Sequence, residues 1–238
     1  MTLPIIEAPS YELTLPSKNE VVKYRPFLVK EEKILLVALE DGTQQAMIRA
    51  IKDICYSCTY EKLPVDELPL FDLEFVFLNI RAKSVGEVAK LRILCPDDRK
   101  TYANIEVDLT KVDVLVDDNH TNDIIIDKDK KLGIIMKYPN LEDLNDIGDF
   151  TAATSKELFD IIAKGIDYVY EGETKYKGKD YSTEEMNKFL ENLTGRVLND
   201  IKKFYDTSPK LKHTVEVENP ETKVKSKVTL QGLMDFFG

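Results

Sequence analysis

The sequence predicts a mixed α+β fold in which helices and antiparallel strands follow one another in blocks. Apolar residues recur at helical spacing in some stretches and alternate with polar residues in others. Strong turn sequences separate the alternating stretches, so hairpins are expected. We divide the 238 residues into three segments, which could also form one continuous domain. They are a hairpin with a helical unit (1–86), an antiparallel β-meander (87–139), and helices with a terminal hairpin (140–238).

The first segment opens with a predicted β-hairpin over residues 11–25. Apolar and polar residues alternate there on both sides of a Pro-Ser-Lys-Asn turn at 16–19. A helix is expected to begin after Pro26, since proline is poorly tolerated deeper inside one, and to end at Gly42. Its unbroken apolar run at 34–39 is too short to cross a bilayer, so we interpret it as a buried helix.

Two further helices complete this unit. The first has one apolar stripe formed by Met47, Ile51, Ile54, Cys55 and Cys58. Pro69 suits the first turn of the next helix. Apolar residues cover most of the circumference of that helix and leave a narrow polar edge at Asp72, Asn79 and Lys83. Such a helix packs on two sides, within its domain or against a partner chain.

Strands are expected in the middle segment because the apolar period changes there from 3.6 to 2. A Pro-Asp-Asp-Arg turn at 96–99 joins the first two of them. We interpret the set as one antiparallel meander with a single buried face. The expected strands lie at residues 89–95, 103–109, 112–116, 124–126 and 132–136.

Helices return after an acidic, turn-rich stretch at 140–154. Thr154 with Glu157, and Ser182 with Glu185, are candidate capping boxes that start two of them. The first is expected to continue along a stripe that ends at Ile166 and Val169, followed by a polar loop at 171–181. Gly195 is expected to break the chain and Ser208-Pro209 to stop the last helix.

The end of the sequence predicts a hairpin that turns at 219–222. Its outer face carries Glu216 and Glu218 on one strand and Lys223, Lys225 and Lys227 on the other, and such cross-strand pairs favour a single register. The last apolar side chains are costly to leave in water, about 1.5–3 kcal/mol each. They are expected to dock on the chain's own core or on a partner. Together with the third helix they form our predicted partner-binding set: Phe71, Phe75, Phe77, Leu78, Met234, Phe236 and Phe237.

Charge and hydropathy narrow the classes of function. A net charge of −10 argues against a nucleic-acid surface, which requires clustered lysine and arginine. The sequence does not begin with the basic-then-apolar pattern of a signal peptide, and no apolar run is long enough to span a membrane. A cytoplasmic protein is expected.

Motifs that could carry chemistry are weak. Cys55 and Cys58 have metal or redox spacing, but they lie in phase with a helical stripe, and with Cys95 they are best explained as buried free thiols. The stretch from 172 to 179 has the wrong length for a phosphate-binding loop. His120 is expected in a solvated loop, and His213 is expected to pack within a strand. We predict no catalytic residues, no metal site and no cofactor.

Four long motifs together resemble a known family. They are the runs at residues 11–16, 24–33, 68–87 and 230–238, which read YELTLP, YRPFLVKEEK, LPLFDLEFVFLNIRAKSVGE and LQGLMDFFG. The sequence is similar to the baseplate hub protein family of T4-like contractile-tailed bacteriophages, the product of gene 26 in that group. The resemblance covers nearly the whole chain. It implies a non-enzymatic role in building the central hub of the tail baseplate, and it supplies no catalytic residues.

From this resemblance we expect an assembly protein that binds other baseplate hub or tail proteins in the host cytoplasm. Two alternatives stay open: a permanent structural subunit in the tail baseplate of the virion, and a hydrolase directed at cell-wall material. An oligomer of the chain is compatible with each of them.

Overall fold

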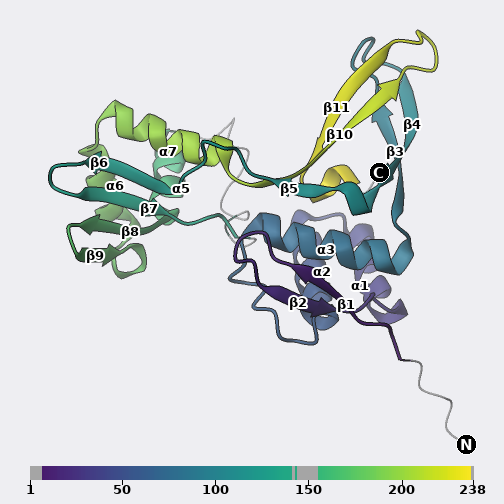
Figure 1. Cartoon of the computed structure of the whole chain (residues 1–238), viewed down its shortest axis with the longest axis horizontal. Coiled ribbons are helices and arrows are strands. Elements are labelled where there is room, and N and C mark those ends of the chain that lie inside the picture. Colours follow the sequence, from purple (N-terminus) through teal and green to yellow (C-terminus); the bar gives the residue numbers. More distant parts are fainter. Residues whose placement is uncertain (1–6, 141–142, 144–154, 237–238) are drawn as a thin grey trace, which may run out of the picture. The chain divides into compact units, whose positions relative to one another are not determined.

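The computed structural model divides the chain into two compact units (Figure 1). Unit 1 combines Met1–Leu115 with Lys210–Gly238, and unit 2 is Val116–Pro209. Both contain helices and antiparallel sheets, so the predicted α+β class is confirmed. The limits differ from the three segments expected from the sequence, because the terminal hairpin returns to pair with a strand from the first half of the chain. The structure describes residues 7–140, 143 and 155–236.

Unit 1 begins with the predicted hairpin and three helices. Strands β1 (Tyr11–Thr14) and β2 (Val21–Tyr24) pair antiparallel. Helices α1 (Val29–Asp41), α2 (Gln44–Cys58) and α3 (Leu70–Val85) follow. Each of these elements lies where the sequence predicts it.

Local signals set the ends of these helices. Gly42 adopts a left-handed φ of 69°, and its N–H donates to the carbonyl of Ala38 at 3.1 Å, which closes α1. The hydroxyl of Thr43 accepts the N–H of Ala46 at 3.2 Å and caps α2. Pro69 occupies the position before α3. The predicted limits are therefore confirmed to within a residue or two.

Asp72 departs from the expected polar edge of α3, since it is fully buried. Its carboxylate accepts the backbone N–H of Ser17 at 3.1 Å and also the Ser17 hydroxyl. Burial raises the pKa of Asp72, and the hydrogen bonds from Ser17 oppose that rise. This contact ties the turn of the first hairpin to α3.

Two hairpins of unit 1 lie side by side (Figure 1). One consists of β3 (Val88–Leu94) and β4 (Tyr102–Asp108), and the other of β10 (Lys210–Glu218) and β11 (Lys225–Gln231). Strand β5 (Asp113–Leu115) adds to β10 on the side away from β11. The terminal hairpin has the register that its charges predict, with glutamate opposite lysine on the outer face.

The turns of these hairpins are fastened together. Asn219 is buried, and its amide donates to the Asp97 carboxylate at 3.0 and 3.1 Å. The Thr222 hydroxyl donates to the same carboxylate at 2.6 Å. Cys95 and Val217 pack beneath. The predicted turn at 219–222 is confirmed, but the sequence indicated nothing of its contact with Asp97.

In the described part of unit 2, helices α5, α6 and α7 pack on a four-stranded antiparallel sheet of order β6-β7-β8-β9. The strands are β6 (Asp123–Asp127), β7 (Leu132–Met136), β8 (Ile166–Glu171) and β9 (Thr174–Lys177). The helices are α5 (Ser155–Lys164), α6 (Thr183–Glu191) and α7 (Gly195–Thr207). Its core includes Ile134, Met136, Leu190, Ile201 and Phe204.

Three expectations about strand and helix limits are wrong. The middle strands do not form one meander: β3 and β4 pair with each other, β5 pairs with β10, and β6 and β7 join β8 and β9. Residues 166–169 are a strand, because α5 ends before Gly165 and β8 then pairs along β7. The expected loop at 171–181 contains β9.

Of the two predicted capping boxes, the structure describes one. Ser182 and Glu185 form theirs at the start of α6: the Ser182 hydroxyl accepts the Glu185 N–H at 3.3 Å, and the Glu185 carboxylate accepts the Ser182 N–H at 2.9 Å. Thr154 lies outside the described residues. The last helix ends at Thr207, before Ser208 and Pro209, as predicted.

Candidate interaction surface

Helix α1 leaves most of its apolar side chains in solvent. Only Glu31 and Ala38 of this helix are buried. The expectation that residues 34–39 form a buried helix is therefore wrong. The exposed fractions are 66% for Val29, 53% for Leu36, 64% for Val37 and 55% for Leu39.

These side chains are exposed because the apolar run surrounds the helix, whereas neighbouring elements pack on only part of it. Six consecutive apolar residues go round the whole helix, since each position advances by about 100°. Helix α2 is the main neighbour of α1, and of the six residues in the run Ala38 is buried and Leu35 is half-buried. The other apolar side chains of α1 stay largely uncovered by the part of unit 1 that the structure describes.

A polar network holds the beginning of α1 instead. Arg25 Nη2 lies 2.8 Å from Glu31 Oε1, and the Ser57 hydroxyl donates to the same oxygen at 2.9 Å. The N–H of Leu28 donates to Glu31 Oε2 at 2.8 Å. Burial by itself would raise the pKa of Glu31, but the hydrogen bonds from Arg25, Leu28 and Ser57 outweigh it and lower the pKa to about 2. Because these contacts fix the helix at its first turn, its opposite side can stay uncovered.

The uncovered side of α1 carries apolar and charged side chains in a regular arrangement. Helical geometry places Val29, Lys33, Leu36 and Glu40 opposite the buried positions Glu31 and Ala38, with Val37 at the flank of that outward side. All five of these outward residues are exposed. We call them the α1 face: three apolar side chains, with a lysine toward the beginning of the helix and a glutamate near its end.

None of the predicted partner-binding residues belongs to the α1 face, and most of those described are buried. The chain itself covers Phe71, Phe77, Leu78 and Phe236. Phe75 is half-buried, so partner contact there stays a prediction. The Met234 side chain and Phe237 lie outside what the structure describes. The sequence signal for α1 was the apolar run itself, but a run without a polar side does not indicate which residues face outward.

The C-terminal segment docks on α3. In the short helix η3 (Leu233–Phe236), Phe236 is fully buried. The N–H of Leu233 donates to Glu74 Oε1 at 3.0 Å. Burial raises the pKa of Glu74 to about 7, although the hydrogen bond from Leu233 opposes that rise. Of the two expected outcomes for Phe236, docking on the chain's own core is the one observed.

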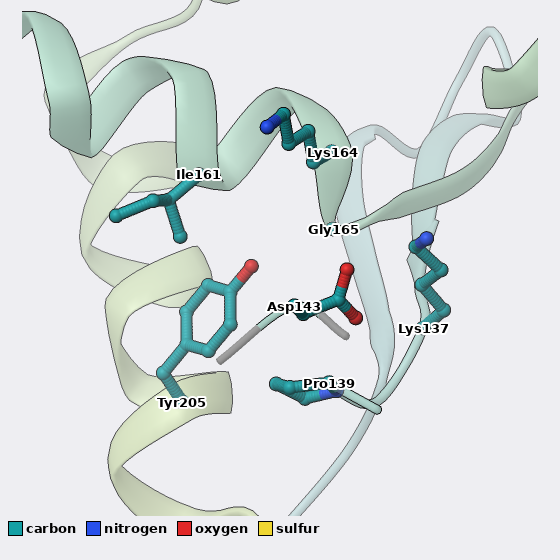
Figure 2. Close-up of a pocket in the computed structure, with 7 residues that line it drawn as sticks. All are labelled: Lys137, Pro139, Asp143, Ile161, Lys164, Gly165 and Tyr205. Atoms are coloured by element: carbon teal, nitrogen blue, oxygen red, sulfur yellow. The ribbon is translucent and has the colours of Figure 1, made fainter. Parts of the chain in front are cut away.

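Unit 2 contains a small pocket that looks polar at first sight. Figure 2 shows the Tyr205 hydroxyl and the Asp143 carboxylate turned toward Gly165. The cavity is about 20 Å³, room for about one water molecule. Burial and the nearby Asp143 raise the pKa of Tyr205, so the phenol stays protonated. The cavity is therefore too small to hold a ligand much larger than a water molecule. The lining residues are Lys137, Pro139, Asp143, Ile161, Lys164, Gly165 and Tyr205.

His120 lies in an exposed loop as expected, but its side chain is half-buried. Its Nδ1 is 2.9 Å from the Thr207 hydroxyl and its Nε2 is 2.9 Å from the Tyr138 hydroxyl. The ring stacks on Phe204 with a centroid distance of 5.4 Å. Burial lowers the pKa of His120, so a neutral imidazole links the loop to α7. Its role is structural.

The cysteines are buried and free, as predicted. Burial raises the pKa of Cys55 and brings that of Cys58 to about 11, so both thiols are protonated at neutral pH. Within the described ranges, no group of three or more His, Cys, Asp or Glu side chains is arranged to hold a metal ion. The stretch from 172 to 179 forms the turn between β8 and β9, then β9 and a short 3₁₀ turn.

None of the helices in the described part of the chain combines the length and hydropathy needed to cross a bilayer. No curated protein and no solved structure matches the chain. The family model of the T4 bacteriophage base plate protein does match, over residues 8–238. That match covers nearly the whole sequence, including both units and the α1 face. The chain therefore belongs to the T4 bacteriophage base plate protein family.

Proposed function

We propose that this baseplate protein acts without catalysis in the assembly of the central baseplate hub, in the host cytoplasm, by binding other hub or tail proteins. The α1 face carries the proposal. Exposed apolar side chains grouped on one helix are typical of protein–protein contact sites. Burying Leu36 or Val37 against a partner would contribute about 1–2 kcal/mol each, because each side chain is already partly covered.

The rigid attachment of α1 supports the same proposal. A docking helix that is already ordered loses little conformational entropy on binding. The Arg25–Glu31–Ser57 network orders the first turn, and Gly42 closes the last one. The α1 face is thus presented in a fixed conformation before any partner arrives.

The ionisable groups with shifted pKa values support a non-catalytic role. Glu31 is held by Arg25, and Glu74 by the N–H of Leu233. Tyr205 borders a cavity with room for about one water molecule. An enzyme needs such groups to converge on a pocket that admits a substrate, whereas each of these groups makes a structural contact.

Co-purification from infected cells tests the proposal. The tagged full-length chain and a Val85→Glu control, altered at an exposed valine that ends α3, should retain hub or tail proteins. Leu36→Glu should lose them, because a carboxylate would be buried in the contact. The proposal is wrong if Leu36→Glu is folded by circular dichroism and still captures the same proteins. A band that persists in purified virions would distinguish a permanent subunit from a transient assembly factor.

A further inference from the structure

The charges of the α1 face are arranged symmetrically. Lys33 lies three positions before Leu36, and Glu40 lies three positions after Val37. The order Lys-x-x-Leu-Val-x-x-Glu therefore has its midpoint between the two central apolar residues. Reversing the direction of the helix exchanges the positions of the lysine and the glutamate, and leaves an apolar pair in the centre.

We propose that the α1 face binds the α1 face of a second copy of this chain, with the two helices antiparallel about a two-fold axis. In that arrangement Lys33 of each copy opposes Glu40 of the other, and the Leu36 and Val37 side chains of both copies meet at the axis. A two-fold contact of this kind uses the same patch on both subunits and must be self-complementary. The inference names a partner for the surface on which the proposed function rests.

Charge favours a second copy as the occupant. Two chains with a net charge of −10 repel each other over most of their surfaces. The α1 face carries one lysine and one glutamate, so its own net charge is zero. Antiparallel docking brings unlike charges together at both ends of the contact, whereas parallel docking would place like charges opposite each other.

The proposed contact between two α1 helices is small, so we expect a weak dimer. Helix α1 has 13 residues, a length of about 20 Å. One pair of such helices buries less than the roughly 1,200 Å² that stable interfaces reach. We therefore expect a reversible dimer with a dissociation constant on the order of 10–100 μM.

Sedimentation equilibrium of the full-length chain tests this directly. The chain should be monomeric at low micromolar concentration and dimeric at high micromolar concentration. Leu36→Glu should weaken the dimer about tenfold or more. Val85→Glu, which replaces an equally exposed valine outside the α1 face, should dimerise like the original chain.

Charge reversal gives a test that does not depend on an apolar side chain. Lys33→Glu and Glu40→Lys should each remain monomeric, because each variant has like charges at both ends of the contact. An equimolar mixture of the two should recover the dimer, since all four charges are then complementary. Arg49→Glu, at an exposed position of α2, is the matched control and should behave as the original chain.

Two results would overturn the inference: a chain that stays monomeric at every concentration, or a mixture that dimerises no better than its components. These results differ from a failure of the proposed function. If the chain is monomeric but tail-protein capture still depends on Leu36, only the self-association is wrong. If it dimerises but Leu36→Glu still captures those proteins, the assembly role of the α1 face is wrong.

Discussion

Helices α1 and α3 belong to the same unit and are both rich in apolar residues, yet they use them in opposite ways. Phe77 and Leu78 of α3 are almost fully buried, whereas Leu36 and Val37 of α1 are more than half exposed. The sequence pattern alone predicted a buried α1, and an α3 that packs on two sides, within its domain or against a partner chain. The comparison shows that an apolar helix can be buried, but that the elements packed around it determine whether it is.

The neighbours of the two helices differ in number and in origin. Helix α3 is contacted by α2, β5, β10 and two short 3₁₀ helices, most of them from distant parts of the sequence. Helix α1 is contacted mainly by α2, the element that follows it. Long-range packing therefore converges on α3 and leaves α1 at the edge of the unit.

The carboxylates that anchor the two helices also differ. Glu31 of α1 is stabilised in its ionised form by Arg25 and Ser57, and its pKa falls to about 2. Glu74 of α3 is buried with a backbone N–H as its donor, and its pKa rises to about 7. The two helices should therefore respond to pH with opposite sign.

The largest expected change in the free energy of unfolding comes from removing a core side chain of α3. Phe77→Ala should lower the free energy of unfolding by about 3–5 kcal/mol, because it removes a fully buried ring and leaves a cavity. Urea unfolding followed by circular dichroism measures the loss. A change below about 1 kcal/mol would mean that α3 is not the packed centre of unit 1.

Acid should remove the contribution of Glu31. Its folded pKa of about 2 lies below the ordinary value of 4.5, so the stabilisation is complete above pH 4.5 and is lost as the pH falls toward 2. The loss should reach about 3 kcal/mol. Unfolding curves of Glu31→Gln should lack this component, while Glu12→Gln, at an exposed ion pair, should retain it.

Glu74 should produce the opposite slope. Its folded pKa of about 7 lies above the ordinary 4.5, so its contribution is greatest below pH 4.5 and declines as the pH rises through 7. Glu74→Gln should therefore stabilise the protein at pH 8 by about 2 kcal/mol and remove the decline. A variant that is less stable than the original chain at pH 8 would contradict this account.

The smallest effect should be found on the α1 face. Leu36→Ala, measured at low micromolar concentration, should change the free energy of unfolding by less than about 0.5 kcal/mol, since the side chain is more than half exposed. Set beside Phe77→Ala, this variant measures the difference between the two helices directly. A loss of several kcal/mol would show that α1 is packed after all.

Local sequence was sufficient for elements whose signals lie within a few residues. Gly42 ends α1 by adopting a left-handed φ, and Ser182 with Glu185 starts α6. The register of the terminal hairpin follows from its turn at 219–222 and from its alternating charges. These features depend on interactions between near neighbours in the chain, and near neighbours can be read from the sequence.

The tertiary structure alone decided which segments meet. The β-branched and aromatic residues at 166–171 became a strand because β7 was available to pair with them. Asp72 and Asn219 became buried because Ser17 and Asp97, distant in sequence, supply their hydrogen-bond partners. The α1 face stayed in solvent because, among the residues that the structure describes, no distant element makes extensive contact with α1. Burial depends on all the surrounding segments at once. A periodic pattern can therefore indicate which side of an element could be buried, but not which segments cover it.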